Sequence, residues 1–398
     1  VGVGFPTLGP QVWTFTSCLL FMPVAPGLRP AGWTSSTPVH DEEVIEQAKA
    51  GRSPNAIAYI PAESEHLKAL AAINVALCHA VAEQGKSKTA TLDHDATIQE
   101  SHKSQAMPHQ APILPPAAGP SFPQVGGRSH ADLLRCDAPW LLKAIYPFPD
   151  SGKGWEGAKG GVGYQPVAVY WAEQDLVIAD EYRDGNVPAG MDNLPLIRRS
   201  FLSLPAAITK LYFRADSACY ERNVLRWLAD EHRHGGPHGY SGFTISADMT
   251  PELRHVCCEV PDDDWQLVDE RTDETVCCAD VEFTPGNWPK DSQPLRYVAV
   301  RYKKRQGLLF ASGYEQKFLA VVSNRTDISA QQLLRWHWQK AGTIEHIHDV
   351  TKNELGAAPP SKYFGANAAW YRLSMLTYNV LSAMNRSGRR LACWPESA

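Results

Sequence analysis

Long hydrophobic runs are missing from this 398-residue sequence. The longest apolar stretch near the N-terminus, residues 17–26, is far shorter than the roughly 20 residues that a membrane-spanning helix needs. No basic segment precedes it, as one would in a secretory signal. Cysteine is scarce too, and its nine scattered residues, an odd number, do not indicate a disulfide-rich secreted scaffold. We therefore expect a cytoplasmic protein without a membrane partner.

A large excess of one charge is also absent, since 38 Lys and Arg stand against 43 Asp and Glu, a net charge of −5. The distribution along the chain is uneven, however. Residues 296–398 carry 15 basic and 6 acidic side chains, a balance of +9, whereas residues 1–295 have a balance of −14. A polyanionic partner is therefore expected to meet the C-terminal third of the chain.

Hydrophobic periodicity predicts alternating helices and strands. The expected helices are residues 62–83, 221–234, 328–355 (one long helix or a broken pair) and 364–384. The expected strands are residues 89–98, two strands within 164–178 joined by a turn at 173–175, 211–220, 242–248, and several short strands between 249 and 325, among them 307–311.

Composition divides the chain into six segments. Nine prolines within residues 108–150 argue for a loop there. The expected segments are a poorly ordered or unrelated stretch at 1–40, a helical lead-in with the first strand at 41–105, a proline-rich insertion at 106–162, an α/β core at 163–248, a β-rich insertion at 249–325, and C-terminal helices at 326–398.

Three acidic residues stand out by their surroundings. Asp95 lies on a predicted strand, Asp216 near the end of another, and Glu345 in a predicted helix. An ionised carboxylate on a buried strand is costly unless it is paired or bound to a metal. Taken singly, each residue has an ordinary explanation, as a turn former or a solvated helix position. Taken together, two strand aspartates and a helix glutamate suit a two-metal phosphoryl-transfer site.

Several motifs occur in a fixed order: TLDHDAT, GYQPVAVYW, YFRADSACY, FLAVVSNRT and KAGTIEHIHDVTKNELG. In this order they resemble the DDE transposases of bacterial insertion sequences, in the branch with a β-rich insertion before the catalytic glutamate. The resemblance covers about residues 55–105 and 163–386. It implies an RNase H-like α/β fold, a mixed five-stranded sheet flanked by helices and interrupted by a mostly β insertion subdomain.

The resemblance also implies an activity, namely metal-dependent DNA cleavage and strand transfer with Mg²⁺, or Mn²⁺ in its place. The implied partners are double-stranded DNA, as transposon ends and target, and a second copy of the chain in a homodimeric active complex. The implied place of action is the bacterial nucleoid.

The same resemblance assigns roles to individual residues. Asp95, Asp216 and Glu345 match the three catalytic, metal-binding carboxylates, in that order. Asp93 is a weaker candidate for the first role, because the family's pattern is an Asp followed two residues later by Thr, and Thr97 follows Asp95. Lys352 matches a family lysine, seven residues past the glutamate, that contacts a transposon-end phosphate.

One departure from the family affects the expected DNA contacts. Ala341 replaces the arginine that the wider group carries four residues before the glutamate, and Lys340 is its expected substitute as a DNA contact. A basic run further back is expected to anchor the DNA backbone, or else to be a solvated strand end. The run comprises Arg301, Lys303, Lys304 and Arg305.

Alternatives remain open. Because residues 1–40 and 106–162 are unlike the family, the chain could be a degraded or truncated copy, a catalytically inactive DNA-binding remnant. A metal-dependent nuclease on the same fold is the other alternative. Three histidines near the glutamate, His337, His346 and His348, could ligate a transition metal. Surface or DNA-facing positions are the simpler expectation for them.

Overall fold

The computed structural model describes residues 58–101, 107–108, 162–290, 292–305, 308–310, 315–361 and 363–392. The expectations for residues 1–40, and for all but residues 107–108 and 162 of the proline-rich insertion, lie outside the described residues. Three short strands, β2 (Gln99–Glu100), β3 (Met107–Pro108) and β4 (Val162–Tyr164), form a small sheet apart from the main one.

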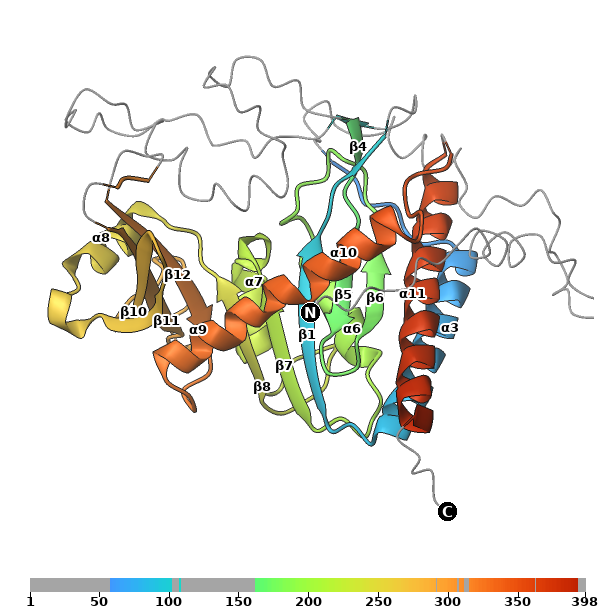
Figure 1. Ribbon diagram of the computed structural model, residues 1–398, viewed down its shortest axis with the longest axis horizontal. Helices are drawn as coiled ribbons and strands as arrows, with labels where there is room; N and C mark the ends of the chain where they lie inside the picture. The colour runs from blue at the N-terminus through green and yellow to red at the C-terminus, as the bar shows by residue number, and fades with distance from the viewer. Residues whose placement is uncertain are drawn as a thin grey trace, which may run out of the picture.

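The main sheet has nine strands in the order β6-β5-β1-β7-β8-β12-β11-β10-β9 (Figure 1). Strands β1, β7 and β8 run parallel, and β5 and β6 complete an antiparallel meander on the other side of β1. This order of five strands is RNase H-like, as expected. The strands are β1 (Thr89–Ala96), β5 (Val167–Trp171), β6 (Leu176–Glu181), β7 (Lys210–Ala215), β8 (Ser241–Ser246), β9 (Gln266–Glu270), β10 (Glu274–Val281), β11 (Arg296–Lys304) and β12 (Gln316–Ser323).

The β-rich insertion widens this sheet. Strand β12 pairs antiparallel with the core strand β8, and β11, β10 and β9 follow outward. The insertion also contains a helix, α8 (Pro251–Glu259), where only strands were expected. Thr250 caps it by accepting a hydrogen bond from the Leu253 amide, and Pro251 suits a first helical turn. The strand expected at residues 307–311 is wrong, because residues 308–310 lie outside any strand.

Helices cover both faces of the sheet (Figure 1). On one face, α6 and α7 pack on Leu92 and Phe213, in one apolar core with α8. On the other face, α9 packs against the insertion strands, and α10 and α11 pack against Ala168 and Tyr170. The sequence did not predict α6. The helices are α3 (Glu65–Gly85), α6 (Asn193–Leu202), α7 (Arg222–Ala229), α9 (Ala330–Trp338), α10 (Ile344–Asn353) and α11 (Phe364–Ala392).

The helical segment at residues 328–355 is a broken pair. Helix α9 ends at Trp338, a 3-10 turn follows at Gln339–Gly342, and α10 begins at Ile344. Glycine at position 342 disfavours a continuous helix. The break lies over the central strands, so Lys340 and Glu345 lie near the end of β1.

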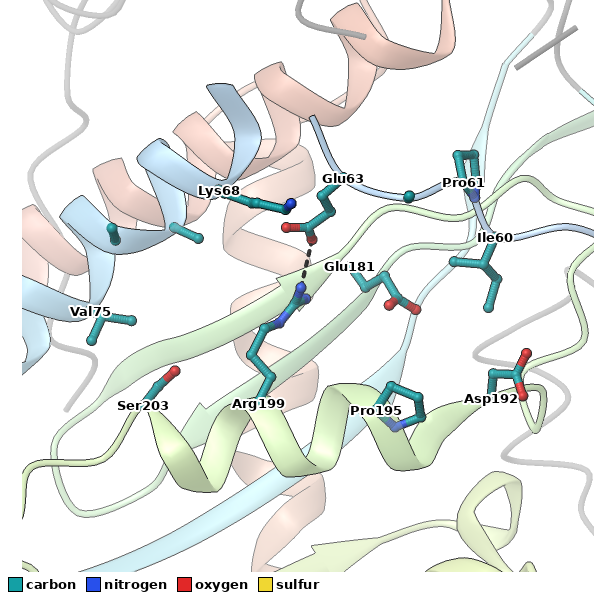
Figure 2. Close-up of a pocket in the computed structure, with 13 residues that line it drawn as sticks. Ile60, Pro61, Glu63, Lys68, Val75, Glu181, Asp192, Pro195, Arg199 and Ser203 are labelled. Atoms are coloured by element: carbon teal, nitrogen blue, oxygen red, sulfur yellow. Dashed lines mark hydrogen bonds and ion pairs between the residues drawn. The ribbon is translucent and has the colours of Figure 1, made fainter. Parts of the chain in front are cut away.

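A buried charge network ties α3 and α11 to the edge strand β6. Arg372 of α11 donates to Asp180 of β6 at 3.1 Å and to Glu63, ahead of α3, at 2.8 Å. Figure 2 shows that Glu63 also pairs with Arg199 of α6, at 2.8 Å, across a cavity of about 630 Å³. The lining of this cavity includes none of Asp95, Asp216 and Glu345.

Candidate active site

Aspartates lie at or just beyond the carboxyl ends of the three parallel central strands. In the β1–β7 ladder, Asp93 lies opposite Arg214 and His94 opposite Ala215, so Asp95 and Asp216 occupy the next position on neighbouring strands. Asp248 comes two residues after β8 ends. Parallel strands end at the same edge of a sheet, and these carboxylates therefore meet there.

Asp95 lies at the centre of this group. Residues alternate between the faces of a strand, so Leu92 enters the core below while Asp93 and Asp95 face α10. The Asp95 side chain is 14% exposed and forms an ion pair with the Lys340 ammonium, whose Nζ lies 3.4 Å from Oδ2. Its other oxygen, Oδ1, accepts from the Ala96 amide at 3.1 Å.

Asp216 directly follows strand β7 and caps a short 3-10 turn. Its Oδ1 accepts from the Ala218 amide at 3.1 Å, which fixes the carboxylate at the sheet edge. Burial raises the pKa of Asp216, the Lys340 ammonium lowers it, and the negative charge of Asp95 raises it further. The two aspartates are therefore close enough to repel each other.

Glu345 approaches the aspartates from the first turn of α10. Partial burial raises its pKa, the charge of Asp95 adds to the rise, and Lys340 opposes it. Asp95 thus influences both Asp216 and Glu345. The three carboxylates that the sequence singled out therefore lie within electrostatic reach of Asp95 and Lys340.

Lys340 was expected to face DNA, and the structure places it elsewhere. Its side chain is buried among the carboxylates, with the residue only 8% exposed. Burial alone would lower the pKa of this ammonium, but Asp95, Asp216 and Asp93 together raise it. Lys340 is therefore the positive charge of the cluster.

Asp93 is held by other partners. Arg214 donates to both of its oxygens, at 2.6 and 2.8 Å, and Thr343 donates to Oδ2 at 2.8 Å. Arg214 also donates to the Trp336 carbonyl at 2.6 Å. Because both Asp93 oxygens are taken, this carboxylate suits a structural role better than metal binding.

Two of the histidines are not on the surface. His337 and His348 are 8% and 6% exposed, whereas His346 is exposed as expected. Burial lowers the pKa of both buried imidazoles to about 3, so they are neutral at physiological pH. The expectation of surface histidines was wrong at these two positions, because the break in the helix turns them toward the sheet.

Most of the basic run on β11 is paired with acids of the insertion. The pairs are Arg301 with Asp262, Lys304 with Asp273 at 2.7 Å, and Arg305 with Glu270 at 3.1 Å. Arg301 also lies over the Trp265 ring, 4.5 Å from its centroid. Lys303 is exposed. These pairings favour a role in sheet stability for three of the four cations.

Lys352 lies in the last turn of α10, two turns after Glu345. It is half-buried, and its charge contributes to the lowered pKa of His348. Asp248 was missed by the sequence analysis, although it lies in a predicted strand just as Asp95 and Asp216 do. Burial raises its pKa, Ser217 donates a hydrogen bond to it and lowers the pKa, and Asp216 raises it.

The donor set fits a hard divalent cation. Asp95, Asp216 and Glu345 offer carboxylate oxygens, which Mg²⁺ prefers. Burial, and then the charge of Asp95, raises the pKa of the latter two, and a bound cation would offset both effects. Within the described part of the chain, no three His, Cys, Asp or Glu side chains lie close enough together to hold an ion. In this arrangement, Lys340 supplies the positive charge.

The mixed sheet with its acidic edge has the architecture of polynucleotidyl-transferase-type enzymes. The chain belongs to the transposase DDE domain group 1 family, whose model matches residues 150–394, more than half of the chain. This confirms the resemblance to DDE transposases. The matched range contains Asp216 and Glu345 and begins after Asp95.

A search of curated proteins gave no match. Among solved structures, the chain is similar to a piggyBac transposase in a synaptic complex with hairpin DNA. The two share 9% sequence identity with a TM-score of 0.34, over 85% of this chain and 71% of that one. In the residues that the structure describes, no helix is both long and apolar enough to span a bilayer.

Proposed function

We propose that the chain is a DNA transposase of an insertion sequence, which cleaves DNA and transfers a strand with the help of divalent metal ions. Asp95, Asp216 and Glu345 are the proposed metal ligands, with Mg²⁺ as the cofactor and Mn²⁺ as its substitute. The observation that carries the proposal is the place of Asp95, which sits beside Asp216 on the neighbouring strand and within electrostatic reach of Glu345.

Divalent ions would supply charge stabilisation at phosphorus and lower the pKa of the attacking hydroxyl. The chain's own residues then have three tasks. The carboxylates of Asp95, Asp216 and Glu345 would bind the metal ions and orient them. The Asp93–Arg214 pair keeps β1 and β7 in register. The turn at Gln339–Gly342 holds α10 against the sheet edge. Since water and then a DNA 3′-hydroxyl attack phosphorus, no Ser, Tyr or Cys nucleophile is assigned.

Double-stranded DNA is the proposed partner, first as a transposon end and then as target, bound by a homodimer of the chain. The balance of +9 over residues 296–398 supports a DNA path along the C-terminal third. Lys352 on α10 and the exposed Lys303 on β11 are the cations best placed for phosphate contacts. Arg301, Lys304 and Arg305 are weaker candidates, because their charges are already paired.

The test is plasmid nicking in Mg²⁺ by the wild-type protein and by Asp216→Asn. The amide keeps the shape of the side chain but removes the charge that would anchor a metal, so cleavage should be abolished. DNA binding, measured by fluorescence anisotropy, should be intact or slightly stronger, because a negative charge near phosphate is gone. Asp262→Asn, the same change on the exposed surface of the insertion, should cleave normally.

The alternatives give different results in the same assays. A nuclease would nick plasmid but yield no strand-transfer product with any particular DNA end. An inactive remnant would bind DNA and fail to nick it in either metal. Full nicking by Asp216→Asn would rule out the proposed site.

A further inference from the structure

We propose that Lys340 is a built-in counterion of the carboxylate cluster, which holds the cluster together without metal and competes with a divalent cation for Asp95. The inference rests on the proposed metal site and adds a residue that sets the metal affinity of that site. It concerns a side chain that the sequence had assigned to DNA contact.

The first support is the position of Lys340. The break between α9 and α10 turns this residue inward, and its Nζ lies 3.4 Å from Oδ2 of Asp95. Its backbone is fixed as well, because the Thr343 amide donates to the Lys340 carbonyl at 3.1 Å. The Thr343 hydroxyl has one hydrogen and two acceptors within reach, Asp93 Oδ2 at 2.8 Å and the Lys340 carbonyl at 2.9 Å, and donates to one of them at a time. The ammonium is therefore held over the sheet edge by a built arrangement.

The second support is the charge around it. A buried ammonium is unfavourable unless carboxylates compensate it, and Asp95, Asp216 and Asp93 all act on Lys340. Asp93 is already neutralised by Arg214, so the charge available to Lys340 comes mainly from Asp95 and Asp216. These are two of the three oxygen donors that a divalent cation would use.

The third support is the geometry of the ligands. The Lys340 ammonium lies 3.4 Å from Asp95 Oδ2, on a carboxylate oxygen that a divalent cation would need. An ammonium and a metal ion cannot both contact the same oxygen of Asp95 without strong repulsion. Metal binding should therefore expel the ammonium, and the flexible four-carbon stem of lysine permits this movement.

The experiment compares the wild-type protein with Lys340→Met, a neutral side chain of similar length. Binding of Mn²⁺ is measured without DNA by electron paramagnetic resonance and calorimetry. Removing the competing charge should tighten Mn²⁺ binding by about tenfold. In EDTA the variant should melt at a lower temperature than wild type, since the carboxylates lose their counterion, and Mn²⁺ should raise its melting temperature more. Lys210→Met, an exposed change at the opposite end of β7, is the matched control and should behave as wild type.

A second measurement uses the unaltered protein, in case Lys340→Met fails to fold. Acetylation of lysine amines, read by mass spectrometry, should be slow at Lys340 in EDTA because the amine is buried and paired. Saturating Mn²⁺ should increase labelling of Lys340 severalfold and leave Lys210 unchanged.

The outcomes separate this inference from the proposed function. If wild type and Lys340→Met bind Mn²⁺ equally well and Asp216→Asn does not bind it, the site is correct and the role of Lys340 is wrong. If none of the three binds Mn²⁺, the metal site and the inference both fail. Labelling of Lys340 that stays constant or falls with Mn²⁺ would also overturn the inference.

Discussion

Arg214 and Asp93 form a buried ion pair between two neighbouring parallel strands, with hydrogen bonds of 2.6 and 2.8 Å. The same guanidinium donates to the carbonyl of Trp336 and lies 5.4 Å from the centroid of its ring. One side chain thus links β7, β1 and the end of α9, directly before the turn that carries Lys340. The pair therefore fixes the two strands and the helix end that position Asp95, Asp216 and Lys340.

Arg214→Met should therefore be strongly destabilising, by about 3–5 kcal/mol in the free energy of unfolding, because it leaves the Asp93 carboxylate buried without a counterion. Urea denaturation measures the effect. Arg222→Met, an exposed arginine on α7, is the control and should cost little. The double variant Arg214→Met with Asp93→Asn should be at least as stable as Arg214→Met alone, because it no longer buries an unpaired charge. A further large loss in the free energy of unfolding would contradict this explanation.

His337 predicts a pH dependence of stability. Burial, followed by Lys340 and Arg214, lowers the pKa of this imidazole to about 3, below its value in the unfolded chain. The unfolded state therefore takes up a proton that the folded state refuses, and stability falls as the pH drops from about 6.5 toward 3. The loss should be about 1.4 kcal/mol per pH unit for this group.

His337→Gln should reduce the slope of stability against pH by the contribution of one titrating group, because an amide does not titrate. The amide can keep the polar contact to Ser246. Urea denaturation at pH 5 and pH 7 measures the change. His346→Gln, on the exposed surface of α10, should keep the wild-type slope. Equal slopes for wild type and His337→Gln would show that His337 is not buried as described.

The two lysines on β11 should behave differently toward DNA. Lys303 is exposed, whereas Lys304 pairs with Asp273 at 2.7 Å and with Glu274 at 3.1 Å. Lys303→Ala should flatten the dependence of log K on log salt by about 0.9, the value for one phosphate contact. Lys304→Ala should leave that slope unchanged. Identical slopes for wild type and Lys303→Ala would move the DNA path away from the insertion.

Lys352→Ala should reduce cleavage more than DNA affinity. This lysine lies two turns after Glu345 on α10, so a phosphate held there would be close to the carboxylates. Positioning errors near the reacting atoms are costly even when binding persists. Cleavage under saturating DNA isolates the effect, and unchanged cleavage would argue against the family-based orientation of the site.

The sequence predicted the core strands well because their patterns are local. Short runs rich in β-branched and aromatic residues, bounded by turn residues, locate β1, β5, β6, β7 and β8. It missed α6, which has only ten residues and includes Pro195. It also missed α8, although Thr250 and Pro251 form a recognisable helix start. Both helices are short, and tertiary packing rather than propensity stabilises them.

The candidate carboxylates were predictable, but their partners were not. Asp95, Asp216 and Glu345 stand out because charge in an apolar context is costly. The pairing of Asp93 with Arg214 depends on the register between two strands 121 residues apart, which no local pattern encodes. The burial of Lys340 depends in the same way on where the helix breaks. The sequence therefore singled out three of the acids at this edge, and it misplaced the lysine.

The order of strands in the sheet also bears on how the protein folds. Strands β10, β11 and β12 pair with their neighbours in sequence, as β5 does with β6, so these parts can form early from local contacts. The pairing of β1 with β7, and the docking of α10 on β1, join distant segments. We expect this seam to close last. A chain still emerging from the ribosome would then carry most of its sheet before Lys340 and Glu345 join Asp95 and Asp216 at its edge.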